Sequence, residues 1–239
     1  MKRNAAQEKR YMAHHRIISQ ARWLKYQKQE AEYWHGNTVL ENRLAYIERH
    51  YAPMMVRYAE GLPDEAHVLD LGCGPVCPSR FVVSGNKTYV DPLLDTFRRA
   101  YPGKLPKGER LAVPTDTIPK PDASFDMIVS IDALDRVMNP ELTLNEARRL
   151  LKTDGAFIFG MKVYPIAVAM ACYYADCFIP VFCHRRHPYF YAHTGIRKTL
   201  QRYFSIVEEY RLPDPEGIDM FGREMAFVCR HQALKGQGG

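Results

Sequence analysis

The feature that most constrains the fold is a short apolar run that ends in a glycine loop. Residues 67–71 read HVLDL, and the sequence GCGP (72–75) follows directly. Two glycines separated by one residue let the backbone turn sharply and approach a ligand closely, because no Cβ intervenes. The pattern predicts a buried strand and a tight turn at its carboxyl end. We expect a helix to begin near Pro78, with its positive end towards the loop.

An acidic residue follows at the spacing typical of a nucleoside site. Asp91 lies nineteen residues beyond Gly72, at the end of a second apolar run, KTYVD (87–91). A carboxylate at the tip of the second strand can accept hydrogen bonds from both hydroxyls of a ribose. The alternative is a tight turn with a surface aspartate, but the loop and the acid together favour a nucleoside ligand.

The loop differs from two common nucleotide-binding motifs. The dinucleotide fingerprint G-x-G-x-x-G requires glycine at position 77, where this chain has Cys77. No G-K-[ST] triplet follows, so the loop does not match a P-loop either. Asp70, two residues before the first glycine, suits a ligand with an ammonium group better than one with a pyrophosphate.

Strands and helices alternate along the rest of the chain. Asn139, Pro140 and Glu141 form a typical helix start, with an N-cap, a proline in the first turn and an acid at the positive end. Strands are predicted at 87–91, 125–131, 155–161, 204–212 and 224–230, and helices at about 93–100 and 140–152. This order predicts an α/β fold with a mostly parallel sheet and helices on both faces.

The first 62 residues are predicted to form a helical cap, followed by a ligand-binding domain at 63–239. Residues 4–35 are rich in helix formers and contain no Gly or Pro. A second helix is expected over 38–60, with a kink or break at Pro53.

Three stretches together resemble the core of class I S-adenosylmethionine-dependent methyltransferases: VLDLGCGP (68–75), YVDPL (89–93) and residues 121–160. The chain is most similar to the group that includes the ubiquinone/menaquinone-type and polyketide-type enzymes. The resemblance covers about residues 67–161, with weaker traces to residue 230. It implies a Rossmann-like, seven-stranded sheet, S-adenosylmethionine as cofactor, and methyl transfer to a small-molecule acceptor.

The resemblance also implies roles for individual residues. Those expected to hold the cofactor are Asp70, Gly72, Cys73, Gly74, Asp91, Pro92, Thr115, Asp116 and Ile131. Three positions depart from the family pattern: Val76 replaces a third glycine, Pro114 an acid opposite the adenine, and Arg136 a histidine. Asp116 or a backbone group is then expected to substitute for the missing acid.

Two side chains are candidates for catalysis. In the family pattern Asp132 lies beside the transferring methyl group, and His187 lies in a segment that flanks the substrate. The alternatives are a solvated loop for Asp132 and a solvated basic segment, 184–187, for His187. Displacement at a sulfonium methyl needs in-line positioning, and a base only where the acceptor must lose a proton. Trp23 and Trp34 are expected to be core residues.

An apolar, aromatic segment follows the predicted strand at 155–161. Residues 163–191 are predicted to form a lid whose aromatic side chains line a pocket for a sizeable, partly apolar acceptor. The aromatic residues concerned are Tyr164, Tyr173, Tyr174, Phe178 and Phe182. The alternative is a helix packed on the sheet. Pro165, Asp176 and Pro180 interrupt the run, so a membrane-spanning helix is not expected.

Charge and composition restrict the partners and the location. Most of the net charge of +6 lies in residues 1–35, which hold eight Lys and Arg against three acids. A basic arm of this kind could contact an anionic membrane, whereas nucleic-acid binding over the whole surface is not expected. The polar start MKRNAAQEKR has no apolar signal segment, so a cytoplasmic location is expected. No metal site is predicted, because the cysteines lack paired C-x₂-C spacing.

Two other functions stay open at this point. A regulatory protein could keep the fold and bind the cofactor without turnover, and the Val76 and Pro114 departures are its only support. A nucleic-acid methyltransferase could use the basic arm, but the [ND]-P-P-[YF] motif is absent where the chain reads SIDA (130–133).

Overall fold

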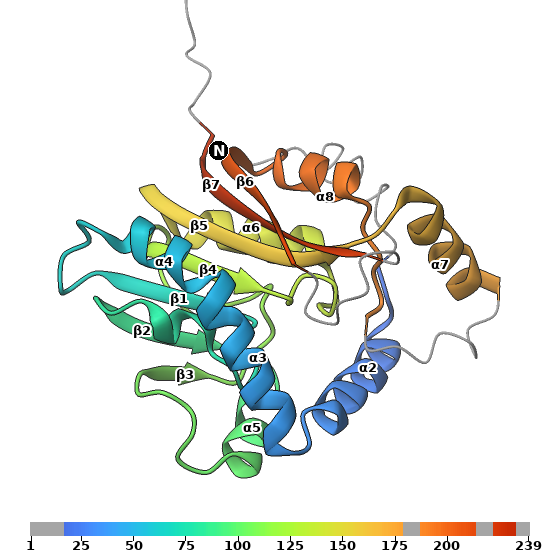
Figure 1. Cartoon of the computed structure of the whole chain (residues 1–239), viewed down its shortest axis with the longest axis horizontal. Helices are drawn as coiled ribbons and strands as arrows, with labels where there is room; N and C mark the ends of the chain where they lie inside the picture. Colours follow the sequence, from blue (N-terminus) through green and yellow to red (C-terminus); the bar gives the residue numbers. More distant parts are fainter. Residues whose placement is uncertain (1–16, 179–186, 214–221, 233–239) are drawn as a thin grey trace, which may run out of the picture.

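The computed structural model describes residues 17–178, 187–213 and 222–232, although the side chains of 176–178 lie outside the description. One seven-stranded sheet in the order β3-β2-β1-β4-β5-β7-β6 forms its centre (Figure 1). The strands are β1 His67–Leu71, β2 Asn86–Val90, β3 Glu109–Leu111, β4 Phe125–Ile131, β5 Leu151–Val163, β6 Phe204–Leu212 and β7 Arg223–His231. β1 to β5 pair in parallel, and β7 lies antiparallel between β5 and β6. The predicted mostly parallel, seven-stranded sheet is confirmed.

Helices cover both faces of the sheet. On one face α3 (Asn37–His50), α4 (Ala52–Ala59) and α5 (Leu94–Ala100) share an apolar cluster with the strands. On the other face α6 (Pro140–Leu150) and α8 (His193–Leu200) contribute to a second cluster. β1 and β4 are buried along almost their whole length, as expected for central parallel strands covered on both sides.

Two helices lie beyond the carboxyl ends of the parallel strands, away from both faces. These are α2 (Gln20–Tyr33) and α7 (Ile166–Phe178), which stand on either side of the edge where β1, β2 and β4 end (Figure 1). Ligands of open α/β sheets bind at this edge, because the loops that follow the strands gather there. The predicted cap and the predicted lid therefore both contribute a helix to this edge.

The helix expected to begin near Pro78 does begin there, but it is only one turn long. Residues 78–81 form a single turn of 3-10 helix, η1 (Pro78–Phe81), and Cys77 before it has a left-handed φ of 49°. Only residues 72–85 connect β1 to β2, and Val76 and Val82 pack in the cluster that α3 and α4 cover. The N-terminal helices occupy the face where a longer helix would lie, and one turn is too short to present a helix dipole.

Two other local predictions are confirmed, the cap at Asn139 and the break near Pro53, and one strand was missed. Asn139 caps α6, with its side-chain oxygen accepting hydrogen bonds from the backbone N–H groups of Glu141 (3.1 Å) and Leu142 (3.3 Å). The helix predicted over 38–60 breaks at Tyr51, and Pro53 lies in the first turn of α4. β3 was not identified from the sequence, because its three residues are exposed or half-buried and carry no apolar pattern.

The predicted basic N-terminal arm is described from residue 17 onwards. Residues 1–16, which carry most of the predicted basic charge, lie outside the described residues. None of the described helices is long and apolar enough to cross a membrane. Within the described ranges, no group of three His, Cys, Asp or Glu side chains could hold a metal ion.

Candidate active site

One cavity of about 1140 Å³ lies at the carboxyl edge of the sheet. Its walls come from the loops after β1, β2 and β4 and from α2, α3 and α7. All predicted site residues except Asp70 line it. From the cofactor set these are Gly72, Cys73, Gly74, Asp91, Pro92, Thr115, Asp116 and Ile131, and both catalytic candidates, Asp132 and His187, are included. The topology therefore brings predicted residues from five separate segments to one space.

The glycine loop is shaped by contacts that a side chain would block. Gly72 has a φ of 71°, and a Cβ there would lie 2.4 Å from the Cβ of Ala133. The loop after β4 thus packs directly on Gly72. Gly74 has a φ of 52°, and a Cβ there would meet nothing within 4 Å. The backbone at Gly74 consequently borders open cavity, which leaves room for a ligand to approach closely.

Asp91 is held in place by the same loop. Its Oδ2 accepts a hydrogen bond from the N–H of Gly74 (3.0 Å), and its Oδ1 accepts one from the N–H of Leu93 (2.8 Å). Burial raises the pKa of Asp91 to about 6. Each carboxylate oxygen can accept a second hydrogen bond, so the oriented Asp91 retains the capacity to bind two hydroxyls.

Asp70 lies below the cavity and does not line it. Its side chain is fully buried, and Oδ2 accepts a hydrogen bond from the N–H of Ser79 (2.7 Å). Burial raises the pKa of Asp70 to about 7. In this structure Asp70 fixes the turn between the glycine loop and η1.

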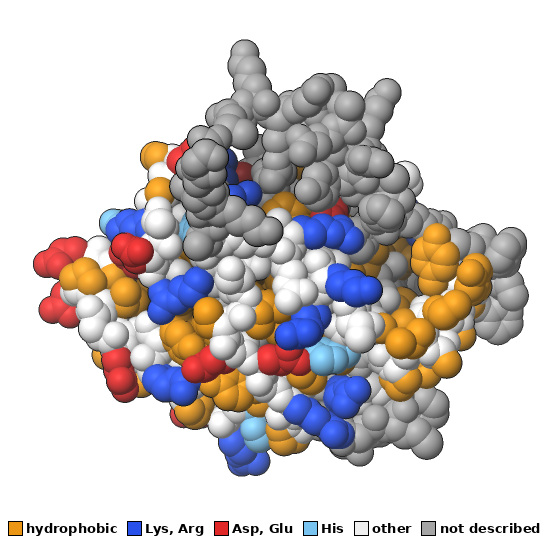
Figure 2. Space-filling model, turned by 90° about the horizontal axis from the view of Figure 1, so that it is seen from above, with side chains coloured by type: hydrophobic (Ala, Val, Ile, Leu, Met, Phe, Trp, Pro, Cys, Tyr) orange, Lys and Arg blue, Asp and Glu red, His pale blue; other side chains and the backbone are white. Residues whose placement is uncertain are grey.

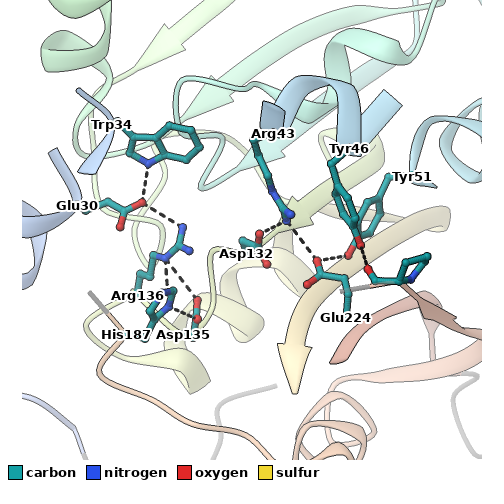
Figure 3. Close-up of polar contacts among 11 residues, drawn as sticks. Glu30, Trp34, Arg43, Tyr46, Tyr51, Asp132, Asp135, Arg136, His187 and Glu224 are labelled. Carbon is teal, nitrogen blue, oxygen red and sulfur yellow. Dashed lines mark hydrogen bonds and ion pairs between the residues drawn. The ribbon is translucent and has the colours of Figure 1, made fainter. Parts of the chain in front are cut away.

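A cluster of polar side chains forms one flank of the cavity (Figure 3). His187 Nδ1 lies 2.6 Å from Asp135 Oδ2, and only 5% of Asp135 is exposed. Burial opposes ionisation of Asp135, but the neighbouring His187 and Arg136 hold the pKa of that carboxyl below its ordinary value. Asp135, which the sequence did not single out, thus orients His187 at the cavity wall.

Arg136 connects this flank to the N-terminal helix α2. Its carbonyl oxygen accepts hydrogen bonds from Trp23 Nε1 (3.2 Å) and Gln27 Nε2 (3.4 Å). Its Nη1 lies 3.1 Å from Glu30 Oε1, which also accepts from Trp34 Nε1 (2.7 Å). Trp34 is buried in the core as predicted, but both tryptophans also line the cavity. The residue that replaces the family's histidine therefore fastens α2 beside the site.

A second polar cluster forms the opposite flank (Figure 3). Arg43 of α3 forms an ion pair with Asp132 and lies 3.3 Å from Glu224 Oε1 on β7. Tyr51 donates a hydrogen bond to the same Glu224 oxygen (2.7 Å). A Cβ at Gly160 would lie 2.3 Å from the Tyr51 hydroxyl, so this glycine makes room for the tyrosine over β5.

The electrostatics of this second cluster are unusual for a protein interior. Burial and the nearby Asp132 raise the pKa of Glu224 to about 8. Burial would lower the pKa of Arg43, but Asp132 and Glu224 hold it above its ordinary value. Asp132, whose backbone has a left-handed φ of 55°, therefore forms an ion pair with Arg43 at the cavity wall.

The comparisons with known proteins agree with this geometry. Residues 69–159 match the family described as a methyltransferase domain, and the strand order is that of class I enzymes. The chain contains a class I S-adenosylmethionine-dependent methyltransferase domain. No curated protein matched the sequence.

Solved structures share the fold at low identity. The PH0226 protein from Pyrococcus horikoshii OT3 is 17% identical with a TM-score of 0.59, covering 80% of this chain and 91% of its own. The YcgJ protein from Bacillus subtilis is 15% identical, with a TM-score of 0.55 and coverage of 76% and 98%. Geranyl diphosphate C-methyltransferase from Streptomyces coelicolor A3(2) is 9% identical, with a TM-score of 0.60 and coverage of 76% and 78%.

The cofactor of this methyltransferase domain is S-adenosylmethionine, and the residues present fit it. The open space at Gly74 admits a ligand next to the backbone, and the oriented Asp91 can accept hydrogen bonds from ribose hydroxyls. When bound, the cofactor supplies a methyl group on a sulfonium as the electrophile. The protein must hold an acceptor atom in line with it.

Described parts of the segment predicted to form a lid border the cavity of the methyltransferase domain, but two of its aromatic residues do not line it. Val168, Cys172 and Ala175 of α7 line the cavity, as do Tyr164 and Phe190 on either side of the helix. Tyr173 and Tyr174, predicted to line it, are instead 51% and 52% exposed, because they lie on the outer face of α7. Figure 2 shows hydrophobic side chains gathered on the surface at the end where α7 lies. The side chains of Phe178 and Phe182 lie outside the described residues.

Proposed function

We propose that this methyltransferase domain transfers the methyl group to a small-molecule acceptor, which enters the part of the cavity between the 131–136 loop, α3 and α7. The supporting observation is that one continuous cavity includes both the cofactor loops and these walls. Pockets for a single small ligand measure roughly 300–1,000 Å³. The cavity of about 1140 Å³ has room for a second, acceptor molecule beside the cofactor.

The mixed lining of the acceptor part favours a partly apolar molecule. Val168 and Ala175 of α7 and Val39 of α3 are apolar, whereas the polar clusters around Arg43 and Arg136 lie on the two flanks. The geranyl diphosphate C-methyltransferase of the same fold was solved with geranyl diphosphate and S-adenosyl-L-homocysteine. A fold of this kind can thus accommodate a small molecule together with the cofactor product.

We propose that His187 removes a proton from acceptors that must lose one. Two contacts compete for His187 Nδ1, because it cannot accept a hydrogen bond from Arg136 and donate one to Asp135 at the same time. Arg136 Nε, which always carries a proton, lies 3.4 Å from Nδ1. The 2.6 Å contact with a buried carboxylate favours an Nδ1–H that donates to Asp135. The basic nitrogen is then Nε2, on a ring that lines the cavity.

Asp132 is better suited to positioning than to proton transfer. Its carboxylate is ion-paired with Arg43, and the pair joins the N-terminal cap (1–62) to the loop after β4. We propose that this cap and the 163–191 segment close the acceptor site of the 63–239 domain. Both contribute residues to the cavity wall, from α2, α3 and α7.

The cofactor assignment predicts a loss of affinity on replacing Asp91. Two hydrogen bonds from ribose hydroxyls to a charged group contribute about 1.5–3 kcal/mol each, so Asp91→Ala should weaken binding of S-adenosylhomocysteine by at least about tenfold. Isothermal titration calorimetry measures this directly. Asp95→Ala, on the exposed side of α5, is the matched control and should bind as the unaltered protein does. Equal affinity of a folded Asp91→Ala variant would contradict the assignment.

Turnover separates the enzyme from a protein that only binds the cofactor. The protein is incubated with S-adenosylmethionine and mixtures of small phenols, acids and amines, and mass spectrometry follows S-adenosylhomocysteine and methylated products. Formation of both supports the proposal. Cofactor binding without product from any mixture would favour the regulatory alternative.

A further inference from the structure

We infer that the acceptor carries a carboxylate, which binds the guanidinium of Arg43. This inference rests on the proposed function, because it names the substrate class of the same cavity. Arg43 lies on α3 in the N-terminal cap, outside the segment that matches the methyltransferase family. It lines the cavity next to Asp132, the residue that follows the end of β4.

Arg43 has hydrogen-bonding capacity that the protein does not use. Both of its ion pairs, to Asp132 and to Glu224, are made by the same atom, Nη2. A guanidinium has five N–H groups, three of which belong to Nη1 and Nε. Among the described residues these three find no partner. The side chain is 15% exposed and its exposed part faces the cavity, so a ligand can reach these donors.

The guanidinium is also held in a fixed orientation. Asp132 and Glu224 fix one nitrogen of Arg43. The guanidinium carbon lies over the ring of Tyr46, 4.6 Å from the ring centroid. Glu224 is fixed in turn by Tyr51, which packs against β5 at Gly160 (Figure 3). A group held in this way loses little conformational entropy when it binds a ligand. The planar fork of arginine matches the two oxygens of a carboxylate.

The local charge balance favours an anion over a cation. Lys162 of β5 lies directly opposite Glu224 in the sheet register and also lines the cavity. Burial and the nearby Asp132 raise the pKa of Glu224 to about 8, so near neutral pH Glu224 is largely protonated and adds little negative charge beside Arg43. With Glu224 protonated, fewer carboxylates at this flank compete with an anionic ligand for Arg43.

The test compares ligands that share an apolar part and differ in the charge and type of their polar group. The protein is saturated with S-adenosylhomocysteine and titrated with three matched sets: benzoate, benzamide and benzylamine; their 4-hydroxy derivatives; and octanoate, octanamide and octylamine. Trp23 and Trp34 are the two tryptophans of the chain and both line the cavity, so their fluorescence reports binding. In at least one set the carboxylate should bind about tenfold or more tightly than the amide and the amine, as expected for hydrogen bonds to a charged group. Equal binding within every set, or no binding by any carboxylate, would overturn the inference.

Variants then assign the preference to Arg43. Arg43→Met should abolish the preference for the carboxylate, and Arg43→Lys, which keeps the charge and loses the fork, should retain part of it. Arg98→Met, an exposed arginine of α5, is the matched control and should behave as the unaltered protein. A preference that survives in a folded Arg43→Met variant contradicts the inference.

Glu224→Gln distinguishes ligand binding from a structural role of Arg43. This change keeps the side chain uncharged, as protonated Glu224 is below its pKa of about 8, and keeps an oxygen that can accept from Arg43 and from Tyr51. Carboxylate binding should be retained or tightened. A tenfold weakening would mean that the ion pair is structural, and tighter binding of the amines would mean a cationic acceptor. Failure of S-adenosylhomocysteine to bind at all would instead contradict the proposed function.

Discussion

Replacing His187 with alanine is expected to lower kcat by about 10²- to 10⁴-fold, the usual contribution of a positioned general base. The effect should appear with acceptors that lose a proton, such as phenols and carbon acids. Binding of S-adenosylhomocysteine should change little, because the glycine loop and Asp91 lie on other segments. Single-turnover measurements, with binding followed separately by calorimetry, test both statements.

His193→Ala is the matched control for this prediction. His193 also pairs with a carboxylate, that of Glu209, but it does not line the cavity. The His193→Ala variant should retain the kcat of the unaltered protein. Asp135→Asn should lower kcat in the same direction as His187→Ala, because an amide can no longer stabilise the protonated imidazole. If His187→Ala keeps full activity with a phenolic acceptor, the ring has no role in proton transfer.

Which features could be predicted from the sequence depends on how far apart along the chain the interacting residues lie. The glycine loop, Asp91 and the residues after β4 are local motifs, each placed by one strand end, and the sheet topology gathers strand ends at one edge. Their positions could be predicted from the pattern alone. The short η1 could not, because its length depends on α3 and α4 covering the face from elsewhere in the chain.

The acceptor flank depends on tertiary contacts over long separations. Arg43 is 89 residues from Asp132 and 181 residues from Glu224, and no spacing rule connects them. One signal was present: Glu224 is an acid inside an apolar strand, EMAFVC (224–229), and such a residue needs a buried partner. Asp135 was not singled out from the sequence for the same reason, because its partner His187 lies 52 residues away.

The two flanks suggest how the proposed reaction is arranged. The proposed cofactor residues come mostly from the loops that follow β1, β2 and β3, whereas the groups proposed to bind and deprotonate the acceptor come from α3, the 131–136 loop and the segment after α7. The cofactor site can therefore stay constant while the acceptor site changes with the surrounding elements. Arg43 and His187 lie on opposite flanks. Both contact the 131–136 loop, Arg43 through Asp132 and His187 through Arg136 (Figure 3).

Exchanging each loop glycine for alanine should separate stability from cofactor binding. Gly72→Ala combines a left-handed φ of 71° with a Cβ 2.4 Å from that of Ala133. The φ costs roughly 1–2 kcal/mol and overpacking about 1–3 kcal/mol more. For a chain of this length each kcal/mol lowers Tm by roughly 2–4 °C, so a clear fall is expected by calorimetry.

Gly74→Ala should lower stability less than Gly72→Ala and should act mainly on cofactor binding. Its φ of 52° carries the same backbone cost, but its Cβ meets nothing within 4 Å in the protein. The fall in Tm should therefore be smaller than for Gly72→Ala. The methyl group would project into the space proposed for the cofactor, so affinity for S-adenosylhomocysteine should fall at least about tenfold, a loss of about 1.4 kcal/mol. If Gly74→Ala binds S-adenosylhomocysteine as tightly as the unaltered protein, the cofactor does not approach the backbone at Gly74, and the proposed fit at this loop is wrong.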